Sequence, residues 1–171
     1  MKVAFISLGC AKNLVNTEQM MALCREAGYT VTGEPEGADV AVVNTCGFID
    51  SAKSEAIDTI LSIAPLKEQG RLGKLLVAGC LTQRYQDEIL EELPEVDGIL
   101  GTGSYTDIVP AIETVLEGDP PTYFGDIDHT IEDGERLVST PSYTAYLKIA
   151  EGCDNRCSYC VIPYLRGRYR S

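Results

Sequence analysis

The alternation of short apolar runs with longer stretches of helical periodicity is what most constrains the fold of this chain. Five runs have the composition of buried strands, namely KVAFISL, YTVT, ADVAVVNT, KLLVAG and DGILG. Helical spacing of apolar residues follows the first, third, fourth and fifth of them. Strands that alternate with helices predict an α/β protein with a doubly wound parallel sheet, here over residues 1–117.

The helix boundaries can also be predicted. One helix should run from about Ser51 to Gln69, with Ser51 as its N-cap. The segment TQRYQDEILEEL is predicted to be a single helix, and Pro110 should lie in the first turn of the last helix or kink it.

Beyond the last helix the sequence changes character. Residues 118–144 are rich in Pro, Gly, Asp and Thr, which predicts a linker. The segment TAYLKIAEG then predicts a new strand at 145–150, at the start of a second unit that covers residues 145–171.

Composition and charge limit the classes of function. The start MKVAFISLG is too short for a signal peptide, and no apolar run approaches the ~20 residues of a membrane helix, so we expect a cytoplasmic protein with no membrane partner. The net charge is −12, but residues 151–171 carry two acidic and four basic side chains. Such an acidic protein repels phosphate backbones, so direct nucleic-acid binding is unlikely. The acidity could attract a basic protein partner or serve solubility alone.

Three of the seven cysteines follow predicted strands. Cys10, Cys46 and Cys80 come after the first, third and fourth strands, each beside a glycine and just before a helix. Ligands bind at the carboxyl edge of an open parallel sheet, and helix N-termini there favour thiolates. We therefore expect these three cysteines to form one metal site, with the glycines allowing close approach of a bulky ligand. The alternative is that they are small core residues, which is the role we expect for Cys24 in the middle of a helix.

The stretch EGCDNRCSYCVIPY holds a second, tighter set: Cys153, Cys157 and Cys160. Soft thiolates select zinc or an iron–sulfur cluster. Zinc would need a fourth ligand, and the single histidine, His129, is expected to be a surface residue of the linker. An iron–sulfur cluster held by three cysteines, with one iron left open, fits the number of available ligands better than zinc does.

The C-x3-C-x2-C spacing, with Tyr159 before the last cysteine, resembles the signature of radical S-adenosylmethionine enzymes. In that superfamily the three cysteines hold a [4Fe-4S] cluster whose open iron binds S-adenosyl-L-methionine, and the cofactor is cleaved to a radical that abstracts hydrogen from carbon. The resemblance implies that residues 145–171 are the first strand and cluster loop of an incomplete partial barrel.

Together with the first three cysteines, the sequence resembles the methylthiotransferase family. That resemblance implies a second [4Fe-4S] cluster on Cys10, Cys46 and Cys80. The segments SLGCAKN, NTCGFID and VAGCLTQ are similar to the branch that methylthiolates the β-carbon of an aspartate in ribosomal protein uS12, with an electron donor such as flavodoxin or ferredoxin. Asn16 and Thr17 stand where that family usually has Asp-Ser.

Two other functions remain open from the residues alone. One is the related tRNA adenosine methylthiotransferase activity, and the other is a non-catalytic flavodoxin-like or zinc-binding module. The family also has a full barrel and a C-terminal β-domain, so we expect the chain to be an N-terminal fragment that is inactive on uS12 by itself. In its basic tail, Arg166, Arg168 and Arg170 alternate, and we expect them to lie on a solvated face rather than line a route for an anionic substrate.

Overall fold

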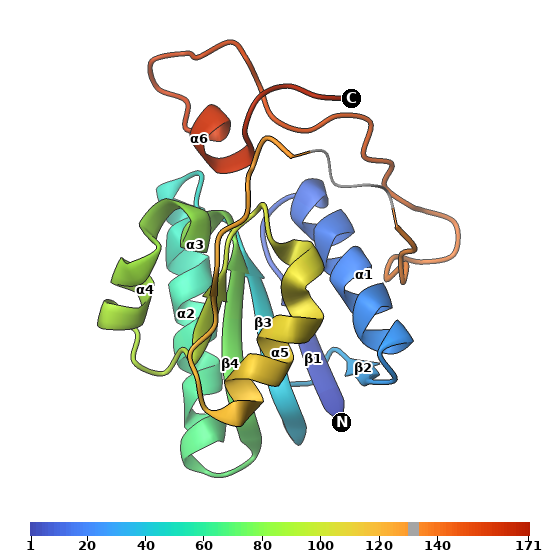
Figure 1. Cartoon of the computed structure of the whole chain (residues 1–171), viewed down its shortest axis with the longest axis vertical. Helices are drawn as coiled ribbons and strands as arrows, with labels where there is room; N and C mark the ends of the chain where they lie inside the picture. The colour runs from blue at the N-terminus through green and yellow to red at the C-terminus, as the bar shows by residue number, and fades with distance from the viewer. Residues whose placement is uncertain (130–133) are drawn as a thin grey trace.

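A six-stranded parallel sheet between two layers of helices forms the body of the molecule (Figure 1). The computed structural model describes residues 1–129 and 134–171, apart from the side chain of Asp87. The strands are β1 (Lys2–Ser7), β2 (Thr30–Thr32), β3 (Ala38–Thr45), β4 (Leu72–Gly79), β5 (Gly98–Leu100) and β6 (Thr122–Tyr123). Their order is β2-β1-β3-β4-β5-β6, so the direction of winding reverses between β1 and β3. The predicted doubly wound α/β fold is confirmed.

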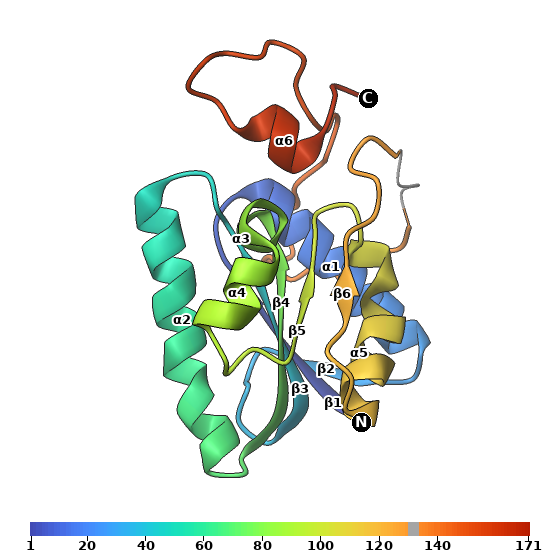
Figure 2. The ribbon, with the colours of Figure 1, turned by 60° about the vertical axis from the view of Figure 1, so that its left-hand side comes forward.

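The helices divide between the two faces of the sheet (Figure 2). One face is covered by α1 (Ala11–Glu26) and α5 (Ile108–Glu117), and the other by α2 (Asp50–Glu68), α3 (Cys80–Tyr85) and α4 (Asp87–Glu92). A 3-10 turn, η1 (Tyr105–Asp107), leads into α5, and α6 (Ile162–Arg166) lies near the carboxyl end of the chain. Within the described residues, no helix combines the length and apolarity needed to cross a membrane.

The central strand β3 shows why both faces need helices. Val40 and Val42 pack toward α1 and α5, whereas Ala41 and Val43 pack toward α2. Side chains alternate between the faces of a strand, so a strand that is apolar at successive positions must be buried on both sides. The continuous apolar run in the sequence is the direct signal of this environment.

Several predicted boundaries are wrong in detail. The expected single helix after β4 is broken at Gln86, whose φ of 40° is incompatible with a right-handed helix, and the break lets Ile89 of α4 pack against the α2 side of the sheet. Helix α2 begins at Asp50 after Ile49, which makes no side-chain cap, so Ser51 is not the N-cap. Pro110 does lie in the first turn of α5.

The segment predicted as a linker contains more structure than its composition suggested. Strand β6 adds to the sheet edge by pairing with β5. Further along, Ser139 donates from its backbone N and its Oγ to the buried carboxylate of Glu18 on α1, at 2.8 and 2.9 Å. Leu137 N also donates to the backbone O of Glu18 at 3.0 Å. This part of the segment is thereby fixed along α1.

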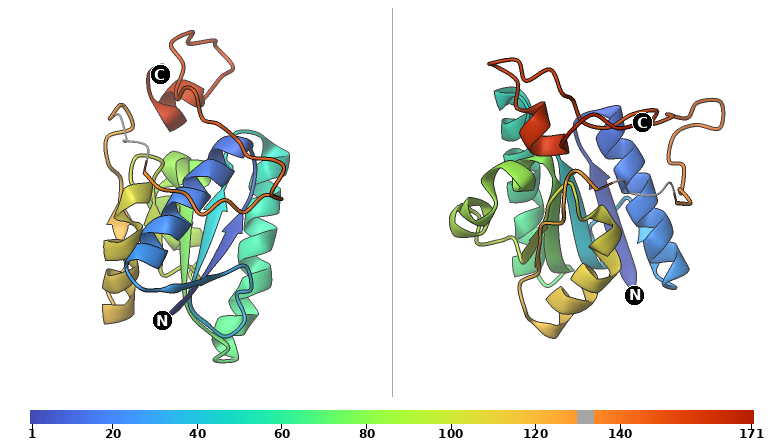
Figure 3. Two further views of the ribbon diagram at one scale, coloured as in Figure 1. Left: turned by 90° about the vertical axis from the view of Figure 1, so that its right-hand side faces the viewer. Right: turned by 45° about the horizontal axis from the view of Figure 1, so that its top comes forward.

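No strand forms at 145–150, which corrects the sequence-based prediction. The chain there crosses the carboxyl edge of the sheet without regular structure (Figure 3), and Leu147 and Ile149 are exposed. A strand requires a neighbour for its backbone hydrogen bonds, and the pairing found here is limited to an antiparallel bridge between Glu151 and Arg170.

Truncation of Ile60 should test the placement of α2. Ile60 is fully buried against the sheet, so Ile60→Ala should lower the free energy of unfolding by about 2–5 kcal/mol in chemical denaturation. Leu61 on the same helix is 45% exposed, and Leu61→Ala should cost about 1 kcal/mol or less. Equal losses for the two variants would contradict this orientation of the helix.

Candidate metal centre

The first three cysteines lie at one edge of the sheet, as predicted. Strands β1, β3 and β4 are neighbours, and their carboxyl ends lead into Cys10, Cys46 and Cys80. Cys10 is the N-cap residue of α1 and Cys80 is the first residue of α3. Cys80 is buried, Cys46 is half-buried and Cys10 is exposed, so the group of thiols opens toward solvent on the Cys10 side.

The glycines beside the cysteines allow the three loops to interlock. A Cβ on Gly9 would lie 2.5 Å from the Cβ of Cys46 and 3.3 Å from its Sγ. A Cβ on Gly47 would lie 2.8 Å from the carbonyl oxygen of Cys80. The expected role of the glycines, to admit a bulky ligand, is therefore incomplete: they first of all let one cysteine loop press against the next.

Buried asparagines fasten the same loops by hydrogen bonds. Asn13, which is fully buried, donates through Nδ2 to the carbonyl oxygens of Leu8 and Thr45 at 3.0 and 2.9 Å. Asn44 donates through Nδ2 to the backbone O of Asn13 and to Thr17 Oγ1, both at 2.9 Å. Thr17, one of the two positions that depart from the family pattern, retains the hydroxyl that this contact uses.

Arg166 is a residue of this edge that the sequence analysis misplaced. Expected on a solvated face, it is 5% exposed and donates through Nη2 to the Oδ1 of Asn13. It is buried because α6 packs against α3: Leu165 is 1% exposed, and its carbonyl accepts from the hydroxyl of Thr102. Arg168 is exposed, as predicted, and Arg170 is half-buried, so the three alternating arginines do not share one face and their spacing did not indicate that Arg166 is buried.

Burial controls the electrostatics of the deepest thiol. Desolvation raises the pKa of the Cys80 thiol, and the positive charge of Arg166, within hydrogen-bonding reach, offsets part of that rise. Cys46 and Cys10 are close enough to raise the same pKa further. At Cys80, burial therefore opposes the stabilisation of the thiolate that we expect from a helix N-terminus.

The arrangement of the thiols bears on the kind of metal centre. Among the described residues, no group of three or more His, Cys, Asp or Glu side chains surrounds a point that a single metal ion could occupy. This holds for Cys10, Cys46 and Cys80 as well. A [4Fe-4S] cluster takes a cysteine at each of several irons, so its ligands surround a larger body. Three soft donors on three interlocked loops, open on one side, fit a cluster of that kind.

Comparison with known proteins identifies the family of the chain. Residues 2–101, which carry the sheet from β1 to β5 and all of the first three cysteines, match the uncharacterized protein family UPF0004. The chain belongs to this family.

Relatives of the chain extend the similarity beyond the UPF0004 region. A protein of Clostridioides difficile (strain 630) named "Ribosomal protein uS12 methylthiotransferase RimO" is 53% identical over 172 residues, which cover 100% of this chain and 39% of the relative. A protein of the same name from Desulforamulus reducens is 52% identical over 99% of this chain and 38% of its own length. The chain thus spans about two-fifths of the length of these relatives.

The second cysteine set lies outside the UPF0004 match, at the same end of the molecule as the first. Cys153, Cys157 and Cys160 occupy a loop between Glu151 and α6. Cys160 N donates to the carbonyl of Cys157 at 3.0 Å, and Cys153 N donates to the carbonyl of Gly167 at 3.1 Å. The three side chains are half-buried or exposed, and His129 lies on the surface as predicted.

Glycine-to-alanine substitutions should distinguish loop interlocking from simple backbone strain. Gly9 and Gly28 both have a φ of 84°, where an alanine costs about 1–2 kcal/mol, but a Cβ on Gly28 would meet nothing within 4 Å. Gly9→Ala should therefore destabilise the chain more than Gly28→Ala in chemical denaturation. It should also reduce iron uptake, because Cys46 must move. If Gly9→Ala and Gly28→Ala have equal effects on the free energy of unfolding and on iron content, the close contact between the loops of Gly9 and Cys46 is contradicted.

Cys24 should be dispensable for metal binding. It lies on the buried face of α1 and is fully buried in the core, and desolvation raises the pKa of its thiol to about 12. Cys24→Ala should cost about 1 kcal/mol of stability through the small cavity it leaves. Iron content after anaerobic reconstitution should equal that of the parent chain, and a loss of several irons would overturn the assignment of Cys24 to the core.

Proposed function

We propose that the chain is the N-terminal part of a radical S-adenosylmethionine enzyme that methylthiolates the β-carbon of an aspartate in ribosomal protein uS12. In this proposal Cys10, Cys46 and Cys80 hold one [4Fe-4S] cluster. A second is held by the set Cys153, Cys157 and Cys160, which also binds S-adenosyl-L-methionine through the open iron. The observation that carries the proposal is the meeting of three thiols from three strands at one sheet edge, in a chain about half identical to uS12 methylthiotransferases over its whole length.

The residues of the chain would have three tasks in such a reaction. The clusters and S-adenosyl-L-methionine supply, when bound, the radical chemistry and the sulfur and methyl groups that side chains cannot provide. The thiols of each set hold and orient their metal centre, and the Asn13 network keeps the loops of the first set at fixed spacing. Lys12 donates to Ala150 O at 2.6 Å, which holds the start of the second unit against the first.

The acidic net charge of the chain suits this function. Because the net charge is −12, the chain would attract a basic protein substrate and repel a nucleic acid, which favours uS12 over a tRNA adenosine as the target. We further propose a cytoplasmic location and reduction of the clusters by a flavodoxin or ferredoxin.

Iron and acid-labile sulfide per chain, measured after anaerobic reconstitution, test the two-cluster assignment. We expect about eight irons in the parent chain and about four in each of two triple variants, Cys10→Ala/Cys46→Ala/Cys80→Ala and Cys153→Ala/Cys157→Ala/Cys160→Ala. His129→Ala should bind as much iron as the parent.

A triple variant of the first set that keeps the full iron content would show that this edge of the sheet is not a metal centre. Zinc bound in place of iron under the same conditions would favour the alternative of a structural zinc module. Circular dichroism of each variant would show that it is folded before its iron is counted.

A further inference from the structure

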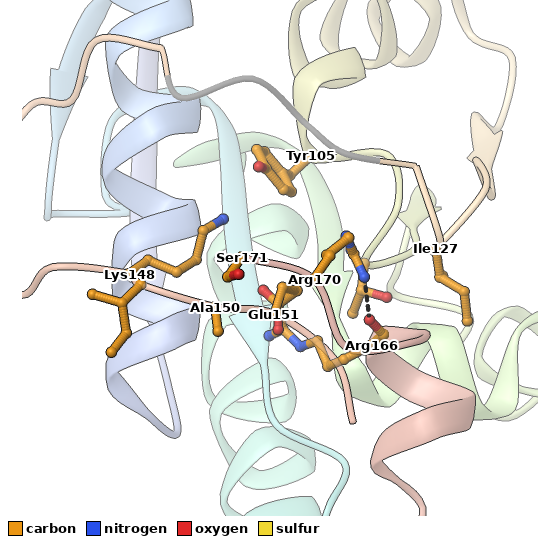
Figure 4. A pocket seen from close by; sticks show the side chains of 10 residues that line it. Tyr105, Ile127, Lys148, Ala150, Glu151, Arg166, Arg170 and Ser171 are labelled. Atoms are coloured by element: carbon orange, nitrogen blue, oxygen red, sulfur yellow. Dashed lines mark hydrogen bonds and ion pairs between the residues drawn. The ribbon is translucent and has the colours of Figure 1, made fainter. Parts of the chain in front are cut away.

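Arg166 brings a buried positive charge to the first cysteine set from the segment that carries the second. Its guanidinium and the Sγ of Cys80 approach the same atom, Asn13 Oδ1, to which Arg166 donates and from which Cys80 lies 3.9 Å away. The backbone is held as well, because Arg170 Nη1 donates to the carbonyl oxygen of Arg166 at 3.0 Å (Figure 4). The side chain therefore has a fixed position beside the thiols.

The surroundings of Arg166 leave positive charge facing the cysteines. Its carboxylate neighbour is Glu151, with Nη1 and Oε2 3.5 Å apart, but Glu151 Oε1 also pairs with Lys12 at 3.2 Å. Burial opposes ionisation of Glu151, yet the charges of Arg166 and Lys12 outweigh it and lower the pKa of the carboxyl. Arg166 and Lys12 thus share the carboxylate of Glu151.

A buried cation that is not fully neutralised is costly unless an anion completes its environment. The electrostatic coupling of Arg166 reaches Cys80 and Cys10 of the first cysteine set, whose thiols become anionic when they bind a metal. Thiolates that ligate a metal centre would provide the missing negative charge. A guanidinium also offers several N–H donors in a rigid plane, which suits sulfur acceptors around a cluster.

We propose that Arg166 is an electrostatic partner of the metal centre on Cys10, Cys46 and Cys80, where its charge and N–H groups raise the reduction potential of that centre. The proposal rests on the proposed function, because it requires a cluster at this edge. Hydrogen bonds to sulfur and nearby net charge are established determinants of cluster potentials. Since Arg166 belongs to the C-terminal segment, the reduction potential of the first centre would depend on the packing of that segment, which carries the second cysteine set, against the sheet edge.

The test is a redox titration of the 171-residue chain in which Cys153, Cys157 and Cys160 are replaced by alanine, so that one cluster remains. The midpoint potential of this parent is compared with those of Arg166→Met, Arg166→Lys and Glu151→Gln added to it. Arg168→Met is the matched control, because Arg168 is exposed two residues away. Circular dichroism and iron content establish that each variant is folded and loaded.

The expected result is a lower midpoint potential for Arg166→Met and a smaller decrease for Arg166→Lys, which keeps the charge but not the planar fork. Glu151→Gln removes the shared carboxylate and should raise the potential; it decides the question if Arg166→Met fails to fold or to bind iron. Arg168→Met should match the parent.

If Arg166→Met binds iron and its midpoint potential equals that of the parent, the inference is overturned and the proposed metal centre stands. If Arg166→Met does not fold or bind iron, an unchanged midpoint potential in Glu151→Gln has the same consequence. Absence of iron from the parent itself would overturn the proposed centre, and the inference with it.

Discussion

The amide of Asn13 connects the parts of the molecule on which the candidate centre depends. Its Nδ2 joins the loop after β1 to the end of β3, and its Oδ1 receives Arg166 from the C-terminal segment near Cys80. Because the amide is fully buried, each unmade hydrogen bond would cost about 1–3 kcal/mol, so the loops cannot separate freely. One side chain thereby fixes cysteine loops that are distant in sequence.

Interlocked glycines and the asparagine network act on the site in complementary ways. The close contacts at Gly9 and Gly47 limit how far the loops can move toward each other, whereas the hydrogen bonds of Asn13 and Asn44 limit how far they can move apart. The spacing of the thiols is therefore set by the protein before a ligand binds. Such rigidity suits a metal centre whose ligands come from three separate loops.

The sequence predicted the sheet well because its strands are buried on both faces and leave unbroken apolar runs, as at β3. It also placed Cys10, Cys46 and Cys80 at one edge, since the carboxyl ends of neighbouring parallel strands share that edge. It failed where the outcome depended on tertiary contacts. Nothing local in LRGRYRS indicates that Arg166 is covered by α3, and Gln86 shows no residue preference for the positive φ that breaks the helix after β4.

The antiparallel bridge between Glu151 and Arg170 has a consequence for the entropy of the second cysteine loop. Reciprocal backbone hydrogen bonds of 2.8 and 2.9 Å bring together the two ends of the loop that holds Cys153, Cys157 and Cys160. The conformational entropy lost on closing a loop is thus lost during folding rather than when a ligand arrives. Because the loop is already closed, its three sulfurs have fewer accessible positions, and binding of a ligand costs less conformational entropy.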